Sequence, residues 1–148
     1  MTTPTPHGER TLLAIDYGTR RTGIAVGQEL TGAATPLTTL NSINDQPDWK
    51  GLKKLLEKWQ PDALIVGIPT HMDGSTHELT ALAREFTRQL STRFKIDIFE
   101  CDERLTSYEA ENMLKEEKFD PVKDKHKIDA IAAQLILEDW MNQQGHTN

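Results

Sequence analysis

The sequence predicts an α/β fold, in which a mixed five-stranded sheet carries helices on both faces. Three β-prone segments follow one another without an intervening helix, at residues 11–16, 22–27 and 32–40. Two more strand-like segments, 62–68 and 95–101, are each preceded by a stretch with helical spacing. The length of 148 residues suits one domain with a single core. Three antiparallel strands followed by α/β units fit one such layered domain.

The first two strands are expected to form a hairpin. Residues 11–16 (TLLAID) are a short apolar run that ends in a carboxylate, which is typical of a buried strand. The turn YGTRR then leads into a second strand at 22–27 (TGIAVG). The third strand, at 32–40, contains Pro36, which has no backbone N–H to donate, so this strand is expected at an edge of the sheet.

The middle of the chain alternates helix and strand. Apolar residues at helical spacing predict a helix over 48–59, with Pro47 before it and Pro61 just past its end. The nearly continuous apolar run 62–68 (DALIVGI) predicts a central strand that is buried on both faces. Residues 95–101 alternate between polar and apolar side chains, as a strand should.

Capping signals predict the remaining helices. Ser75 and Glu78 form a capping box ahead of a helix to about residue 94, and Thr106 and Glu109 open another to about residue 118. The last helix is expected over 127–142, which places Asp129 in its first turn. Its apolar stripe is expected to comprise Ile128, Ile131, Ala132 and Leu135.

The composition indicates a soluble globular protein, with 36% hydrophobic and 27% charged residues. Cys101 is the single cysteine, so an intramolecular disulfide is impossible, which fits a reducing compartment. The polar N-terminus lacks the apolar core of a signal peptide, and no apolar run is long enough to span a membrane. We therefore expect a cytoplasmic protein with no membrane contact, a flexible leader at 1–10, one domain at 11–143 and a tail at 144–148.

The net charge of −6 argues, by itself, against a nucleic-acid ligand, because phosphates are usually bound by clustered Lys and Arg. The distribution of charge along the chain matters more than the net charge, since the active site of a metal-dependent nuclease must itself be acidic. Basic residues collect in three places, which are Arg20–Arg21, the stretch Arg84/Arg88/Arg93/Lys95, and Lys123–Lys127.

Three carboxylates are candidates for a metal site that hydrolyses phosphodiester bonds, a reaction that two hard cations can promote together. Asp16 ends the first apolar strand, Glu103 follows the last one, and Asp129 opens an otherwise apolar helix. Each also has an ordinary structural explanation. Asp16 could form a turn, Glu103 could be a loop acid, and Asp129 could complement the helix dipole.

Four blocks of the sequence resemble, in order, the YqgF (RuvX-like) family, which is described as Holliday-junction-resolvase-like. They are DYGTRRTGIAVG at 16–27, VGIPTHMDGS at 66–75, DERLTSYEA at 102–110 and KIDAIAAQLIL at 127–137. The first block alone would be weak evidence for the family, because D-x-G-T also opens the phosphate loop of actin-like ATPases. Four blocks in order cover nearly the whole chain after the leader.

The resemblance implies a ribonuclease H-like fold and a metal-binding trio at Asp16, Glu103 and Asp129, with Mg²⁺ or Mn²⁺ as the cofactor in a two-metal site. It also links the chain to maturation of the 5′ end of 16S ribosomal RNA from its precursor. On this interpretation Asp16 bridges both metals, and Glu103 and Asp129 each complete one.

Further residues are expected to bind the substrate. Gly18, with Gly23, would allow close approach of the substrate backbone. Arg20, Arg21 and Arg104 are candidate phosphate clamps, because the planar guanidinium matches phosphate oxygens. Lys125 and Lys127 could hold a nucleic-acid strand near Asp129. An ion pair for Arg104 and a solvated loop for the lysines are the structural alternatives.

Three functions remain open on the sequence. The favoured one is a metal-dependent nuclease that acts on structured RNA, the ribosomal RNA precursor, as a monomer or homodimer. The second is a Holliday junction resolvase that acts on branched DNA with the same trio, as a dimer. The third is a non-catalytic binding module for nucleic acid or a transcription complex. An actin-like ATPase would need two such domains, for which 148 residues do not suffice.

Overall fold

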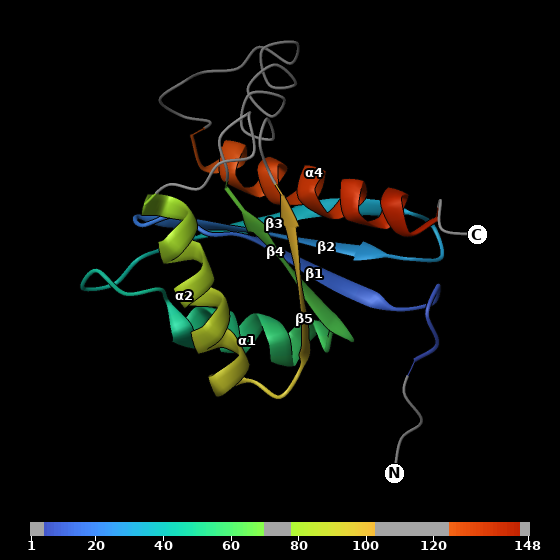
Figure 1. Cartoon of the computed structure of the whole chain (residues 1–148), viewed down its shortest axis with the longest axis horizontal. Helices are drawn as coiled ribbons and strands as arrows, with labels where there is room; N and C mark the ends of the chain where they lie inside the picture. Colours follow the sequence, from blue (N-terminus) through green and yellow to red (C-terminus); the bar gives the residue numbers. More distant parts are fainter. Residues whose placement is uncertain (1–4, 70–77, 103–124, 146–148) are drawn as a thin grey trace.

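The computed structural model describes residues 5–69, 78–102 and 125–145, and in the last range the side chains of 128–144 (Figure 1). Its elements are β1 (Thr11–Asp16), β2 (Arg21–Gln28), β3 (Ala33–Asn41), α1 (Trp49–Trp59), β4 (Ala63–Ile68), α2 (Glu78–Arg93), β5 (Asp97–Asp102) and α4 (Lys125–Gly145). None of the helices in these ranges is long and apolar enough to cross a membrane.

The described strands form one mixed sheet in the order β3-β2-β1-β4-β5. β2 pairs antiparallel with both β1 and β3, whereas β4 pairs parallel with both β1 and β5. The predicted fold class is therefore confirmed. The predicted edge position of the third strand is also confirmed, and its pairing with β2 shifts by one residue between Thr38 and Pro36. All six residues of β4 are buried, as expected for an inner strand.

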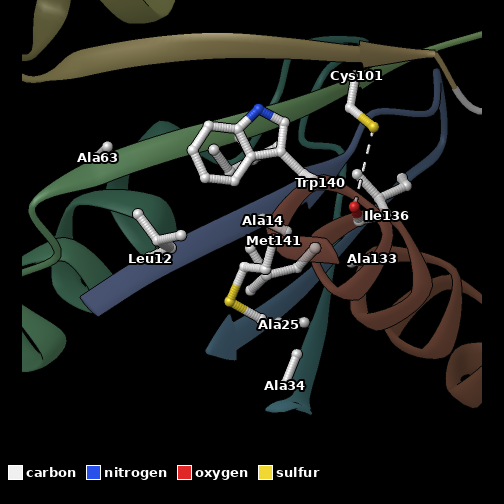
Figure 2. Close-up of a cluster of buried hydrophobic side chains, with 12 residues drawn as sticks. Leu12, Ala14, Ala25, Ala34, Ala63, Cys101, Ala133, Ile136, Trp140 and Met141 are labelled. Carbon is white, nitrogen blue, oxygen red and sulfur yellow. Dashed lines mark hydrogen bonds between the residues drawn. The ribbon is translucent and has the colours of Figure 1, made fainter. Parts of the chain in front are cut away.

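Helices cover the two faces of the sheet (Figure 1). On one face, α4 packs its residues Ala133, Ile136, Leu137, Trp140 and Met141 onto small and aliphatic side chains of the strands (Figure 2). On the other face, α1 and α2 cover a second core, which contains Leu13, Ile15, Ile24, Leu52, Leu64, Val66, Ile68, Ala83, Phe86 and Leu90. Alternate residues of β1 thus serve different cores.

The predicted helix at 48–59 is confirmed, with residue 48 as its cap. The Asp48 carboxylate accepts a hydrogen bond of 2.9 Å from the backbone N–H of Gly51. At the other end Gln60 adopts a left-handed conformation and donates its N–H to the Leu56 carbonyl. The capping box at Ser75 and the predicted helix at 106–118 lie outside the described residues.

Two expectations about the last helix were wrong. α4 begins at Lys125, not at residue 127, so Asp129 lies in its second turn. This start could not be predicted, because the residues before 128 are polar and show no helical spacing of apolar side chains. Of the predicted stripe only Ala132 is buried, whereas Ile128, Ile131 and Leu135 are half-buried. Ala130 and Ala133 are buried as well. Small side chains are selected there because the helix lies very close to the sheet.

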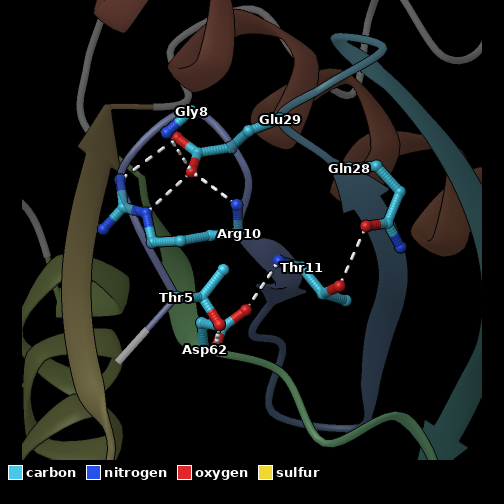
Figure 3. A network of polar contacts seen from close by, with 7 residues as sticks. All are labelled: Thr5, Gly8, Arg10, Thr11, Gln28, Glu29 and Asp62. Atoms are coloured by element: carbon cyan, nitrogen blue, oxygen red, sulfur yellow. Dashed lines mark hydrogen bonds and ion pairs between the residues drawn. The ribbon is translucent and has the colours of Figure 1, made fainter. Parts of the chain in front are cut away.

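The part of the expected leader that the structure describes, residues 5–10, is held to the domain (Figure 3). Thr5 donates its hydroxyl to Asp62 at 2.7 Å. The buried Arg10 guanidinium donates from Nε to Glu29 Oε1 at 2.8 Å and from Nη2 to Oε2 at 3.1 Å. Glu29 Oε1 also accepts from the backbone N–H groups of Gly8 and Arg10. The division into leader, domain and tail stays a prediction.

Two glycines of β2 let α4 approach the sheet. A Cβ atom on Gly23 would lie 2.0 Å from the backbone oxygen of Asp129, and no side-chain movement could relieve that clash. A Cβ atom on Gly27 would lie 2.7 Å from the Cδ2 atom of Leu137, the end of a flexible side chain. The contact at Gly23 is therefore backbone against backbone and the less adaptable of the two.

We expect Gly23→Ala to lower the free energy of unfolding by about 3 kcal/mol, since overpacking against a backbone requires the helix to move. Gly27→Ala is the matched control, because it adds the same methyl group to the same strand and face. We expect it to cost less, about 1 kcal/mol, since its closest contact is the end of the Leu137 side chain and the Ala33 carbonyl oxygen lies further away, at 3.2 Å. Urea unfolding of both variants measures the difference, and equal losses would contradict the backbone contact.

The ion pair between Arg10 and Glu29 should make stability depend on pH. Burial opposes ionisation of Glu29, but hydrogen bonds from the Arg10 side chain and from the N–H groups of Arg10 and Gly8 outweigh it and hold the pKa of Glu29 below its ordinary value of 4.5. A lowered pKa in the folded state stabilises the fold above pH 4.5 and loses that effect as the pH falls through the folded-state value.

Glu29→Gln should therefore cost about 2–4 kcal/mol at neutral pH, because Arg10 stays buried without its counter-charge. The difference from the wild type should shrink as the pH falls below 4.5. Unfolding free energies at pH 7, 5 and 3.5 measure this. Glu9→Gln, which removes a charge from an exposed neighbour, should show a small and nearly constant difference. A constant difference for Glu29→Gln would argue against the ion pair.

Candidate active site

Four of the five described strands, β1, β3, β4 and β5, end at one edge of the sheet, where the first predicted carboxylate lies. The strand register places Gly23, Asp16, Gly67 and Cys101 in one row across β2, β1, β4 and β5. Asp102, the last residue of β5, lies next to this row. The chain continues from there to Glu103, which is outside the described residues. In open α/β sheets, such strand ends are common places for ligand sites.

Asp16 lies on the α4 side of the sheet, with a glycine on each neighbouring strand. Strand alternation gives it the same face as Leu12 and Ala14, which belong to the α4 core. Its register partners Gly23 and Gly67 carry no side chains, so neither neighbouring strand crowds the half-buried carboxylate from the side. Gly67 was not among the predicted site residues, although a glycine within a continuous apolar strand is a signal for close approach of another backbone or of a ligand.

Asp129 reaches the same place from α4. Its backbone packs on Gly23, the antiparallel partner of Asp16, so the two predicted ligands have a common neighbour. The Asp129 side chain accepts a hydrogen bond from Arg21, with 2.8 Å between Nε and Oδ2. The side chains of Arg21 and Asp129 are 28% and 22% exposed, so the pair is accessible to solvent and to ligands. The structure thus brings two of the three predicted acids together.

The predicted glycines have structural roles of their own. A Cβ atom on Gly18 would lie 2.4 Å from the carbonyl oxygen of Arg21, so the tight turn after β1 requires a glycine. The space above Gly23, expected to admit the substrate backbone, is occupied by the backbone of α4. That expectation for Gly23 was wrong, and a substrate contact at Gly18 stays a prediction.

The turn between β1 and β2 is fixed from both sides. Ser42, just past β3, donates its N–H to the Arg20 carbonyl and its hydroxyl to the Thr19 carbonyl, at 2.9 and 2.8 Å. Tyr17 stacks on Phe86 of α2, with ring centroids 4.7 Å apart, and burial raises the pKa of Tyr17. This contact gives Tyr17 a packing role. Arg20 is exposed beside the site, where a phosphate could reach it.

The remaining predicted site residues are not placed by the structure. Glu103 and Arg104 lie outside the described ranges, and for Lys125 and Lys127 only the backbone, in the first turn of α4, is described. Within the described ranges no three His, Cys, Asp or Glu residues form a group that could hold a metal ion. The described part of the site therefore supplies two carboxylates, whose hard oxygen atoms suit Mg²⁺ or Mn²⁺, and a third ligand must come from elsewhere.

Comparison with known proteins identifies the family. The family model described as "RuvX: Holliday junction resolvase" matches residues 10–143. A protein of Aeromonas salmonicida, named "Putative pre-16S rRNA nuclease", is 44% identical over 91% of this chain and 96% of its own length. A protein of Pectobacterium carotovorum with the same name is 46% identical over 91% of this chain and 97% of its own length.

Solved structures show the same fold. The resolvase of fowlpox virus, solved with Holliday junction DNA, matches with a TM-score of 0.57 and 9% identity over 90% of this chain and 98% of its own. RuvC of Thermus thermophilus, solved with a Holliday junction substrate, matches with a TM-score of 0.52 and 14% identity over 93% of this chain and 97% of its own. These likenesses concern the fold and confirm the predicted ribonuclease H-like class. With the sequence match over nearly its whole length, the chain belongs to the RuvX family.

Proposed function

We propose that this protein is a divalent-metal-dependent nuclease that processes the 5′ end of precursor 16S ribosomal RNA in the cytoplasm. Phosphodiester hydrolysis is the activity to which both the family model and the names of the relatives point. The observation that carries the proposal is the convergence of Asp16 and Asp129 beside Gly23 at the sheet edge. Carboxylates from a strand and a helix that share one glycine neighbour are a candidate ligand pair for a hard cation.

In this proposal Asp16, Glu103 and Asp129 hold the metal. Glu103 is included on sequence grounds, since it follows β5 directly and lies two positions after Cys101, which faces the α4 core. A bound Mg²⁺ or Mn²⁺ would supply an activated water and neutralise charge on the phosphate. The chain's own residues would hold the cation in place and exclude competing groups. Whether one or two cations bind depends on ligands beyond the described residues.

Arg21 has a defined task in this arrangement. Its Nε–H now neutralises Asp129, which would otherwise be a partly buried carboxylate close to Asp16. A cation bound between the acids would take over that neutralisation. The guanidinium, with Arg20 exposed beside it, would then be available to a phosphate of the substrate. The Asp129 pair is thus compatible with the phosphate-clamp role predicted for Arg21.

A Holliday junction resolvase is the second candidate, because the family model carries that description. Both candidates use the same carboxylates, and they differ in the shape of the nucleic acid and in the need for a dimer with two sites. A binding module without catalysis is the third. One experiment separates the three.

Asp16→Asn should abolish metal-dependent cleavage, with a loss of at least about 100-fold, because it preserves the shape of the side chain but removes the charge that binds the cation. The assay offers an RNA with the 16S precursor leader and a four-way DNA junction, each with Mg²⁺, Mn²⁺ or EDTA. Asp102→Asn is a matched control, since Asp102 ends β5 at the same edge but alternates to the opposite face from Cys101. It should retain most of the activity.

Cleavage of the RNA alone would support processing of the ribosomal precursor. Symmetric cleavage of the DNA junction alone would instead show that the protein is a Holliday junction resolvase. Wild-type activity in Asp16→Asn would overturn the proposed site. The remaining outcome is that the wild type cuts neither substrate, while the wild type and Asp16→Asn bind RNA with equal affinity. In that case the protein is a binding module and the catalytic proposal is wrong.

A further inference from the structure

The exposed face of α1 is a stripe of lysines. Lys50, Lys53, Lys54 and Lys58 are all exposed. Lys53 and Lys54 follow Lys50 by three and four residues, and Lys58 follows Lys54 by four, which places all of them on one side of the helix. They span about 12 Å along the helix axis at the usual rise per residue. Glu57 is the single acidic residue of this helix. Among the residues that the structure describes, these lysines make no ion pair.

The second helix on this face of the sheet also carries exposed basic residues. Arg84 and Arg93 of α2 are exposed, and Lys95 follows the helix. Arg88 is exposed as well but forms an ion pair with Glu85. Figure 1 shows α1 and α2 on the same face of the sheet, opposite α4. We call the exposed residues Lys50, Lys53, Lys54, Lys58, Arg84, Arg93 and Lys95 the basic face.

The basic face contrasts with the charge of the chain as a whole. α1 and α2 together carry seven Lys or Arg and three Glu residues. The full sequence has 17 Lys or Arg and 23 Asp or Glu, so the remaining residues are strongly acidic. A positive surface on an acidic protein selects for polyanions while the net charge limits nonspecific binding. The order of charges along the sequence showed part of this surface, at Arg84–Lys95, and the proposed catalytic site does not use it.

A row of stacked aromatic rings connects this face to the candidate site. Tyr17, the residue after Asp16, stacks on Phe86 of α2, and Phe86 stacks on Trp49 of α1 at 5.4 Å between centroids. The guanidinium of Arg93 lies over the Trp49 ring at 4.2 Å. The position of α1, and with it Lys50, is therefore fixed relative to the sheet edge that carries Asp16.

We propose that the basic face of α1 and α2 binds the phosphate backbone of the nucleic acid on the flank of the cleaved segment. The choice of nucleic acid rests on the proposed function, and the charge complementarity rests on the residues above. Lysines on a single helix stripe contact phosphates as point charges and do not read bases, so this binding is expected to be independent of sequence. The acidic sheet edge would then cleave the nucleic acid, and the basic face would hold it on the protein.

The test is binding in EDTA, where no cleavage occurs, so it does not depend on the catalytic proposal. Fluorescence anisotropy would measure the dissociation constants of wild type and of the triple variant Lys50→Gln, Lys53→Gln, Lys54→Gln for the precursor-leader RNA and for the four-way DNA junction, between about 50 and 200 mM salt. We expect the variant to bind about 10- to 100-fold more weakly at 100 mM salt. The slope of log affinity against log salt should fall in magnitude by about 2–3.

Two control variants sharpen the test. Lys50→Arg, Lys53→Arg, Lys54→Arg keeps the charges and should bind as the wild type does. Leu30→Glu, Thr35→Glu, Asn142→Glu changes the net charge by the same amount at exposed positions at the other end of the sheet, and it should retain the salt slope. Thermal unfolding would show that all variants are folded.

Unchanged affinity and salt slope in the glutamine variant would overturn the proposal. Equal weakening of binding in the glutamate control would overturn it too, because the loss of affinity would then follow from net charge alone. Loss of binding to RNA alone would identify RNA as the ligand of this face, and loss on both substrates would identify the phosphate backbone in general. Either result supports the proposal. Failure of Asp16→Asn to lose cleavage would overturn the catalytic site and leave this result standing.

Discussion

The close contact between α4 and β2 at Gly23 is the constraint on which the rest of the structure depends. The helix can lie this close only because Gly23 has no side chain and because Ala130 and Ala133 present small ones to the sheet. The same contact fixes Asp129 beside the register partner of Asp16. Packing and the candidate site are thus not separate features, since the glycine that admits the helix is also the residue that lies beside both aspartates.

The surrounding charges follow from that closeness. Two carboxylates near one another, partly buried, repel unless a cation lies between or beside them. Arg21 provides that cation from the start of β2, where the glycine contact also lies. At the opposite end of the same sheet, Arg10 and Glu29 form a buried pair with additional backbone donors. The first pair is solvent-accessible and can exchange partners, whereas the second is closed and structural.

The sheet and its helices could be predicted from the sequence because their signals are local. The apolar run of β4, the proline of β3 and the cap of α1 each specify their element within a few residues. The two cores also follow from alternation in β1. The start of α4 could not be predicted, because the polar residues 123–127 give no apolar period and therefore read equally well as a loop.

The candidate site could be predicted in its residue types but not in its contacts. Asp16 and Asp129 were identified as carboxylates in apolar surroundings, yet the hydrogen bond between Arg21 and Asp129 joins residues 108 positions apart. Gly23 was assigned to the substrate because nothing near it in the sequence indicates that a helix lies above it. The stacking of Tyr17 on Phe86 likewise joins residues that are far apart in the sequence. Contacts of this kind depend on how layers pack, which local patterns do not encode.

If Asp16 and Asp129 form one metal site, the position of a bound Mn²⁺ ion will show it directly. Crystals of the wild-type protein soaked in Mn²⁺ and measured at the manganese absorption edge would give its place by anomalous scattering. We expect a peak within coordination distance, about 2.2 Å, of carboxylate oxygens from both residues, with the Arg21 guanidinium displaced from Asp129. A Mn²⁺ ion bound elsewhere, or an Arg21–Asp129 pair that persists at saturating Mn²⁺, would contradict it.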